Sequence, residues 1–290
     1  MHPVLFELPG FGPINAYGTL ILLGGLVAMP GVYRDILARG VPRDGAKSML
    51  VDFYLVLVFG AAIGGRVLDV LTVPSNYLDQ PSRLVAMDGT GFVFFGSLAA
   101  IVLGFVWLGR RYRLGFGQVC DLGATWIVLG HAFGRLGCWF AGCCWGAPTD
   151  APWAVQFPSD SVAYGAGEVP HEGTMTVPLH PYQLYEATGL TLLWLWLWWT
   201  RRRNGVETTW RQASRYALGY GVLRTVLEPL RGDPSRGFWF RLEAAPIAEA
   251  LGLPPDQPLL LSTSQAIGLG LVAAGIYGLV RTAARPSERG

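Results

Sequence analysis

The sequence predicts an all-α, polytopic transmembrane helical bundle, and three observations lead to this prediction. Of the 290 residues, 51% are hydrophobic and only 14% are charged, whereas a soluble domain carries about 25% charged residues. The chain contains 11 Trp and 39 Gly; aromatic residues gather at membrane interfaces, and glycine allows close helix packing. Seven segments are long enough to cross a bilayer. We therefore expect a single integral membrane domain over residues 1–290, monomeric and without a nucleic-acid partner.

The seven predicted spans have about 20 residues each, the length that a bilayer requires. The first, third and seventh carry no charged side chain, whereas the second, fourth, fifth and sixth each contain ionisable groups. In chain order the spans are Ile14–Tyr33, Ser48–Val70, Gly91–Leu108, Val119–Phe140, Tyr182–Thr200, Ser214–Leu230 and Leu260–Val280.

The distribution of Arg and Lys between the spans predicts the orientation. Segments 34–47, 109–118, 201–215 and the C-terminal tail hold fifteen of these residues, and the alternate segments hold four. Because cytoplasmic loops are rich in Arg and Lys, we expect the N-terminus outside and the C-terminus in the cytoplasm. The fourth span then runs outward.

Two long segments are expected on the outer face. Residues 147–179 lack Lys and Arg and contain the acids Asp150, Asp160, Glu168 and Glu172. Residues 231–259 include an Ala- and Leu-rich stretch that is predicted to lie on the membrane as an amphipathic helix. Both are interpreted as loops that shape an entrance, although ordinary connectors remain an equal alternative.

Ionisable groups inside the spans indicate where a functional site lies, because they are costly in a bilayer. They are Arg66 and Asp69 in the second span, His131 and Arg135 in the fourth, Glu186 in the fifth, and Arg224 and Glu228 in the sixth, with Tyr220 on the same face and Arg231 just beyond. Helical spacing predicts that Arg224, Glu228 and Arg231 share one face. The groups either pair with each other or, since arginines outnumber glutamates, bind an anion. A guanidinium suits a phosphate, and in a bilayer the phosphate is a phospholipid headgroup.

Three cysteines, Cys138, Cys143 and Cys144, lie close to Arg135 in the run from Gly134 to Gly146. They are interpreted in three ways: as small apolar fillers, as a Cys138–Cys143 disulfide, or with Cys143 as a reactive thiol, either a lipid carrier or a redox centre. No metal site or other cofactor is expected, since no histidine or further cysteine completes a tetrahedral set.

The chain resembles the prolipoprotein diacylglyceryl transferases of bacteria over nearly its whole length. The resemblance rests on matches that follow the family's order, namely Tyr17-Gly18, Gly65-Arg66, Gly134-Arg135-Leu136-Gly137 through Trp145-Gly146, His180-Pro181 with Gln183-Leu184-Tyr185-Glu186, and Tyr220-Gly221 with Arg224, Glu228 and Arg231.

This resemblance implies an enzyme of the bacterial inner membrane, with its active site towards the outer face. It would transfer diacylglycerol from phosphatidylglycerol to the thiol of a lipobox cysteine in a secreted precursor, releasing glycerol phosphate. The catalytic residues it implies are Arg135, Arg224, Glu228 and Tyr17, with Cys143 as a further candidate. The substrate-binding residues it implies are Arg66, Arg135, Cys138, Gly146, Tyr220, Arg231, His180 and Gln183.

The chain departs from the family's pattern at four positions. The family has Asn at the positions of Cys138 and Ala141, Glu at Cys143, and commonly His at Phe95. Two groups that do polar work in the family's site are therefore replaced, the histidine by Phe95 and the glutamate by Cys143. The phenyl ring of Phe95 neither takes up a proton nor holds a carboxylate. The alternative is therefore a membrane protein that binds phospholipid or exchanges thiols and disulfides without the transferase chemistry.

Overall fold

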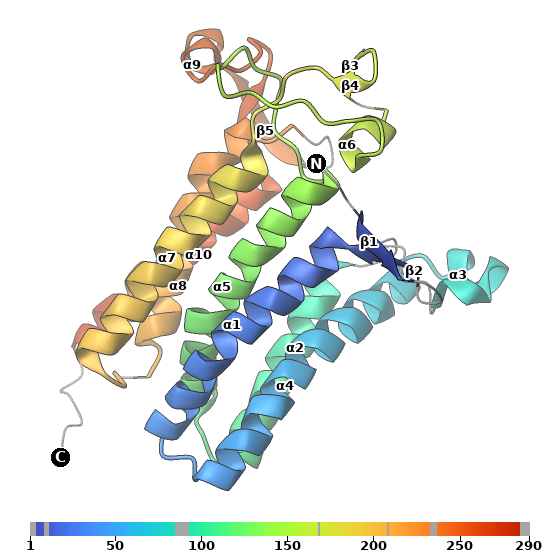
Figure 1. Cartoon of the computed structure of the whole chain (residues 1–290). Coiled ribbons are helices and arrows are strands. Elements are labelled where there is room, and N and C mark those ends of the chain that lie inside the picture. The colour runs from blue at the N-terminus through green and yellow to red at the C-terminus, as the bar shows by residue number, and fades with distance from the viewer. Residues whose placement is uncertain are drawn as a thin grey trace. The chain divides into compact units, whose positions relative to one another are not determined.

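The computed structural model describes residues 4–8, 12–84, 93–167, 169–207, 209–232 and 237–284. Gly91, at the start of the third predicted span, and Glu168 lie outside the described residues. The described part is mostly helical (Figure 1). Its helices of 17 or more residues are α1 (Ala16–Ala38), α2 (Arg43–Thr72), α4 (Phe94–Arg111), α5 (Phe116–Ala141), α7 (Tyr182–Asn204), α8 (Arg211–Leu227) and α10 (Thr263–Ala283).

Each of these long helices overlaps one predicted span, and local sequence explains several of their ends. α10 begins with a capping box in which the side chains of Ser262 and Gln265 satisfy each other's backbone N–H groups. α7 ends at Asn204 and is followed by Gly205, whose positive φ of 70° is a conformation that glycine adopts without a steric penalty. α8 ends at Leu227 because Pro229 follows in a short 3-10 turn, η2 (Glu228–Leu230).

Four of the long helices, α1, α2, α4 and α10, are long and apolar enough to cross a membrane. The other three, α5, α7 and α8, carry His131, Arg135, Glu186 and Arg224. The chain is thus a helical protein with apolar spans, whereas the full set of seven spans stays a prediction.

The described residues are mostly helical, as an all-α class implies, and they also form three two-stranded antiparallel sheets. β1 (Val4–Leu8) pairs with β2 (Gly12–Asn15), β3 (His171–Glu172) with β4 (Met175–Thr176), and β5 (Phe238–Glu243) with β6 (Pro258–Ser262). All are short and lie outside the long helices.

The chain divides into two compact units, residues 29–123 and residues 1–28 with 124–290. In the first unit α2 packs along α4 at a close crossing, where Gly64 and Gly96 leave no space for a Cβ. This unit also holds α3 (Ser75–Asp79) and the 3-10 turn η1 (Pro81–Leu84).

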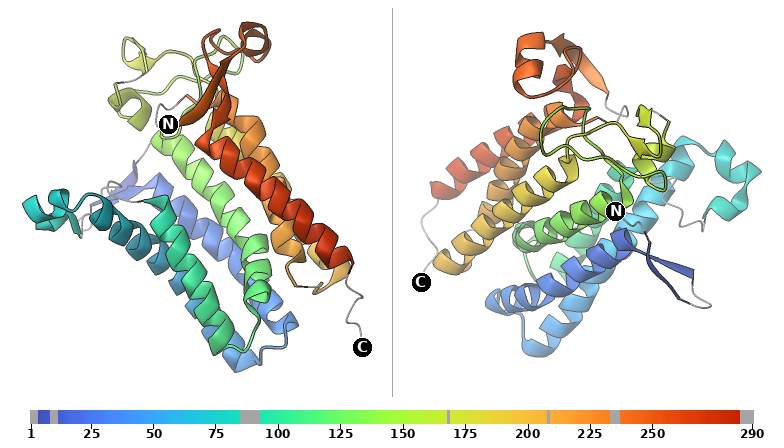
Figure 2. Two further views of the ribbon diagram at one scale, coloured as in Figure 1. Left: turned by 180° about the vertical axis from the view of Figure 1, so that it is seen from behind. Right: turned by 45° about the horizontal axis from the view of Figure 1, so that its top comes forward.

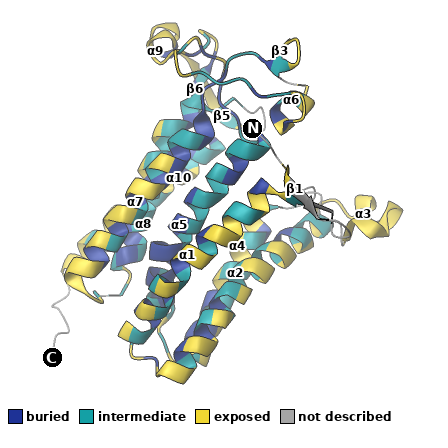
Figure 3. Cartoon of the chain, viewed as in Figure 1, coloured by how far each residue is buried: buried dark blue, intermediate teal, exposed yellow. Residues whose placement is uncertain are grey.

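In the second unit α8 lies between α7 and α10, which Figures 1 and 2 show side by side with it. Gly221 and Gly275 make the α8–α10 contact close, since a Cβ on either would meet the facing helix. The apolar core of this unit forms where α5 meets α7, around Val128, Leu190 and Leu197. Figure 3 shows exposed residues along the outer faces of α7 and α10.

Residues 147–179 are more ordered than a simple connector. Isolated bridges join Pro148 and Val155 to Leu179, and α6 (Val162–Gly165) begins at a Ser161 cap. A small apolar core around Phe157 packs beneath Trp145. Residues 147–179 therefore form a folded segment close to the end of α5, and this segment is called the cap below.

The helix expected within 231–259 is present but short. The Ala- and Leu-rich stretch forms only the six-residue helix α9 (Ala245–Ala250), placed between strands β5 and β6. Pro246 near its start and Pro254 and Pro255 after its end confine it to about two turns.

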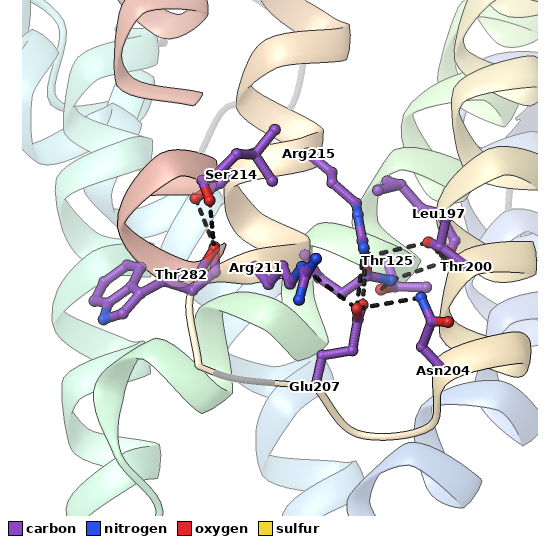
Figure 4. A network of polar contacts seen from close by, with 12 residues as sticks. Thr125, Leu197, Thr200, Asn204, Glu207, Arg211, Ser214, Arg215 and Thr282 are labelled. Carbon is purple, nitrogen blue, oxygen red and sulfur yellow. Dashed lines mark hydrogen bonds and ion pairs between the residues drawn. The ribbon is translucent and has the colours of Figure 1, made fainter. Parts of the chain in front are cut away.

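The connection between α7 and α8 is held by a buried polar network centred on Glu207 (Figure 4). Its carboxylate accepts hydrogen bonds from Arg215 and Asn204, and Nε of Arg211 lies 3.5 Å away. Gln212 donates to the carbonyl of Leu197 at 2.9 Å. These contacts fix the angle between the two helices that carry the candidate site at their opposite ends.

Candidate functional site

A buried ion pair links α5 and α7. Nε of Arg135 lies 3.0 Å from Oε2 of Glu186, and Nε2 of His131, one turn earlier on α5, lies 3.9 Å from the other carboxylate oxygen. The Glu186 side chain is only 2% exposed. Of the two alternatives that the sequence leaves open, pairing within the bundle applies to Arg135, which has a carboxylate partner.

A second ion pair lies within α8 and its 3-10 extension. Nη2 of Arg224 is 2.9 Å from Oε2 of Glu228. The same guanidinium donates to the hydroxyl of Tyr182 on α7 at 2.8 Å and to Ser264 on α10 at 2.9 Å. Ser262 donates to the other oxygen of Glu228 at 2.9 Å. Arg224 therefore ties three helices together at one end of this unit.

Arg231 does not continue the polar face of α8, so the prediction of one helical row through this residue is wrong. The 3-10 turn η2 leads into an extended conformation at Arg231, which forms an antiparallel bridge with Gly146. Its guanidinium carbon lies 5.9 Å from the centre of the Tyr182 ring. Arg224 and Arg231 therefore both contact Tyr182, and this residue joins the two cations through its hydroxyl and its ring.

Gly146, His180 and Gln183 hold the segment after α5 against the start of α7. A Cβ on Gly146 would lie 2.4 Å from the carbonyl oxygen of His180, and the amide of Gln183 donates to the carbonyl of Cys143 at 2.8 Å. Nδ1 of His180 lies 3.2 Å from the hydroxyl of Tyr185. Burial lowers the pKa of His180, although backbone contacts with Gly252 and Leu251 oppose this shift.

The three thiols of Cys138, Cys143 and Cys144 form one cluster, with their sulfur atoms all within 4.8 Å of one another. All four cysteines of the chain are free, so the structure does not contain the Cys138–Cys143 disulfide. Hydrogen bonds from Cys138 and Cys143, together with the charges of Arg135 and Arg231, lower the pKa of Cys144. Hydrogen bonds with Cys138 and Cys144 raise the pKa of Cys143. The charges of Arg135 and Arg231 therefore favour a thiolate within this cluster, and the reactivity of Cys143 stays a prediction.

Tyr17 and Tyr220 lie at the edges of this group. Tyr17 on α1 packs where Gly137 leaves room, since a Cβ there would be 2.9 Å from the Tyr17 backbone. Its hydroxyl interacts electrostatically with Arg135 and the three thiols. Tyr220 on α8 lies with its ring 5.7 Å from that of His131. Both tyrosines therefore border the pair of Arg135 and Glu186, and their roles in binding or catalysis stay predictions.

Arg66 belongs to the other compact unit, residues 29–123. It donates to the hydroxyl of Tyr77 at 3.2 Å, and that hydroxyl donates in turn to Asp69. Phe95 is 56% exposed at the start of α4. A cavity of about 360 Å³ in this unit lies between α2 and α4, lined mainly by apolar side chains such as Phe59.

Sequence reasoning did not single out three residues that the structure places in the site. They are Tyr182 as the link between Arg224 and Arg231, and Ser262 and Ser264 as hydrogen-bond partners. Glu186 is among the ionisable groups of the predicted spans, but the sequence does not identify Arg135 as its partner. Glu186 carries a readable signal, because a carboxylate in an apolar span requires a cationic partner. The two serines carry only the signal of a helix N-terminus, where such residues are common.

Comparison with known proteins agrees with this arrangement. The sequence model of the family described as prolipoprotein diacylglyceryl transferase matches residues 3–281. A phosphatidylglycerol–prolipoprotein diacylglyceryl transferase from Clostridium tetani is 32% identical over 277 residues, which cover 96% of each chain. A second enzyme of this name from Clostridium perfringens is 30% identical, covering 95% of this chain and 93% of its own. One from Nitrosomonas europaea is 32% identical, covering 91% and 85%. The chain therefore belongs to the prolipoprotein diacylglyceryl transferase family.

Proposed function

We propose that this protein transfers the diacylglyceryl group of phosphatidylglycerol to the thiol of a lipobox cysteine in a secreted precursor protein. The other product is glycerol phosphate. Family membership over residues 3–281 supports the reaction. The observation that carries the proposal is the group of buried Arg224 and half-buried Arg135 and Arg231, which is gathered around Glu186 and Tyr182 in one compact unit.

The proposed setting is the bacterial inner membrane, where the chain acts as a monomeric, single integral membrane domain. Seven spans place the N-terminus outside and the C-terminus in the cytoplasm, in keeping with the excess of Arg and Lys in alternate connections. Residues 147–179 and 231–259 are then outer-face loops. The site lies towards the outer face, the side on which a secreted precursor emerges.

Arg135 and Arg224 are proposed to bind the phosphate of the lipid headgroup. Each has one carboxylate partner, Glu186 or Glu228, which fixes the guanidinium plane. A guanidinium has five N–H donors, more than a single carboxylate uses. Arg231, Gly146 and Gln183 position the segment that closes over the headgroup. Membrane lipids surround the helices and supply the donor.

The reaction is a displacement at a glycerol carbon. The acceptor sulfur must attack as a thiolate, because a thiol is a weak nucleophile. The carbon–oxygen bond to the phosphate breaks, and negative charge grows on the departing phosphate. Fixed guanidinium groups in a site shielded from water stabilise this charge strongly, and the hydroxyls of Tyr17 and Tyr220 add hydrogen bonds.

A direct assay tests the proposal. The purified protein in detergent is incubated with phosphatidylglycerol and a lipobox peptide, and release of glycerol phosphate is measured. We expect release with the cysteine peptide and none with its serine counterpart. Arg135→Ala is expected to abolish release, whereas Arg203→Ala, at an exposed cation near Trp199 on α7, is expected to leave it unchanged.

Absence of any release from the wild-type protein would contradict the proposal. Thiol-disulfide exchange lost in Cys143→Ser would then favour the alternative, a membrane protein that binds phospholipid or exchanges thiols. Full transfer by Arg135→Ala would place the phosphate elsewhere.

A further inference from the structure

The three clustered thiols are brought together by a tight turn at the end of α5. Gly142 and Cys144 have φ values of 71° and 54°, and the N–H of Cys143 donates to the carbonyl of Cys138 at 3.1 Å. A positive φ is uncommon and costly for a residue other than glycine. Here it turns Cys144 back towards Cys138, so that all three sulfur atoms lie within 4.8 Å of one another.

We infer that Cys138, Cys143 and Cys144 form a three-thiolate site for a thiophilic divalent cation, and that Zn²⁺ is the ion their chemistry favours. Thiolates select soft or borderline metals, among them Zn²⁺. In a tetrahedral zinc site the zinc–sulfur distance is about 2.3 Å, which puts sulfur atoms about 3.8 Å apart. The three sulfur atoms, all within 4.8 Å of one another, lie near this spacing.

The fourth coordination position of this site is open. Among the residues that the structure describes, no histidine or carboxylate joins the cluster. The missing fourth ligand argued against a metal when only the sequence was considered. It is, however, the feature that distinguishes catalytic zinc sites, with three protein ligands, from closed structural ones.

The surroundings suit the charge of such a site. Three thiolates and a divalent cation carry a net charge of −1, which is costly to bury alone. The guanidinium groups of Arg135 and Arg231 both interact with Cys144, so cationic groups offset this charge.

The open position is inferred to take the thiol of the acceptor cysteine, a step that rests on the proposed transferase function. A thiol bound to such a cation loses its proton, which passes to solvent. The sulfur then attacks the glycerol carbon, forming a carbon–sulfur bond, while the carbon–oxygen bond to phosphate breaks and its electron pair leaves with glycerol phosphate. The metal keeps its oxidation state, and the cluster takes over thiol activation at positions where relatives have Asn and Glu.

Metal titration tests the site without relying on activity. The full-length protein is purified in detergent with reductant, which is then removed under anaerobic conditions. It is titrated with Cd²⁺ while the ultraviolet charge-transfer absorbance of cadmium–thiolate bonds is recorded. We expect one ion per chain, and a loss of affinity of at least about tenfold in Cys138→Ser, Cys143→Ser and Cys144→Ser. Cys120→Ser is the matched control, since Cys120 is outside the cluster, and should bind as the wild type does.

A further variant, Cys143→Ala, removes one thiolate without supplying another ligand. Its cadmium–thiolate absorbance at saturation should fall by about one third while it unfolds at the same temperature as the wild type, which separates loss of a ligand from loss of the fold. An unchanged absorbance and affinity in this variant, no binding by the wild type, or a Cys138–Cys143 disulfide in the protein purified without reductant would overturn the site.

The open position is tested by adding a peptide with a free cysteine to the cadmium-loaded protein. We expect the absorbance to rise by about one third, as a fourth cadmium–sulfur bond forms, and no rise with the serine peptide. An unchanged absorbance would overturn the role of the open position. These readouts stay informative if no glycerol phosphate is released, so failure of the transferase function is distinguishable from failure of the site.

Discussion

The carboxylate of Glu186 lies 3.0 Å from Nε of Arg135 and almost completely out of contact with solvent. This pair joins α5, which carries Cys138 near its end, to the first turns of α7. A buried ion pair is weak support for stability, because desolvation offsets the attraction. The pair is better understood as a contact that fixes the orientation of the Arg135 guanidinium.

The first prediction concerns this pair. Glu186→Gln leaves Arg135 buried without its counter-charge, and such a loss costs about 3–5 kcal/mol. The double variant Arg135→Met with Glu186→Leu removes both charges and is expected to regain most of that stability. Thermal unfolding in detergent measures both.

Activity separates the two roles of the pair. The double variant should release no glycerol phosphate in spite of its stability, because the cation that holds the phosphate is gone. If the double variant were as active as the wild type, the assignment of Arg135 to the phosphate would be wrong.

The positions of the helices could be predicted from the sequence, because apolar length is a strong signal. Each predicted span overlaps a helix, and Tyr182 begins both the fifth span and α7. The end of the sixth span was predicted three residues too late, at Leu230 instead of Leu227. Pro229 explains this difference, and it also moves Arg231 off the helix.

The site could be predicted only in part, because tertiary contacts decide the rest. The sequence predicts Arg135 and Arg224 as intramembrane cations, but their partners depend on how α5, α7 and α10 pack. The thiol cluster depends on positive φ at Cys144, a conformation that propensity argues against. The folded cap after α5 depends on pairing of Pro148 and Val155 with Leu179, residues that carry no local strand signal.

The second prediction concerns the N-terminus of α10. Ser262 caps the helix and also donates to Glu228, so Ser262→Ala removes both hydrogen bonds. Loss of a cap costs about 0.5–2 kcal/mol. We expect a lower unfolding temperature and a higher KM for phosphatidylglycerol, since Glu228 would hold Arg224 less firmly. Ser264→Ala, which removes a direct contact of Arg224, should raise KM without the loss of the cap; an unchanged KM in both variants would contradict this role.

The third prediction concerns Gly146, where the backbone of the cap meets that of His180. The Cβ of Gly146→Ala would lie 2.4 Å from the His180 carbonyl oxygen, so the bridge from Gly146 to Arg231 must shift. Overpacking of this kind costs about 1–3 kcal/mol. Gly165→Ala is the matched control, because a Cβ there meets nothing within 4 Å. Proteolysis of the cap should accelerate in the first variant only, and equal rates in both would contradict the close contact.

The fourth prediction follows from the lowered pKa of His180. The folded protein binds a proton at this ring less readily than the unfolded chain, in which the pKa of histidine is about 6.5. The contribution of neutral His180 to stability is therefore complete above that pH, and it declines as the pH falls towards the lower pKa of the folded state. Unfolding temperatures of the wild type and of His180→Gln, measured from about pH 8 to about pH 5, test this. The difference between the two proteins should shrink as the pH falls, since only the wild type has to take up a proton at position 180 on unfolding. A difference that stays constant over the range would show that His180 titrates alike in both states, and a difference that grows would mean that the folded protein favours the protonated ring.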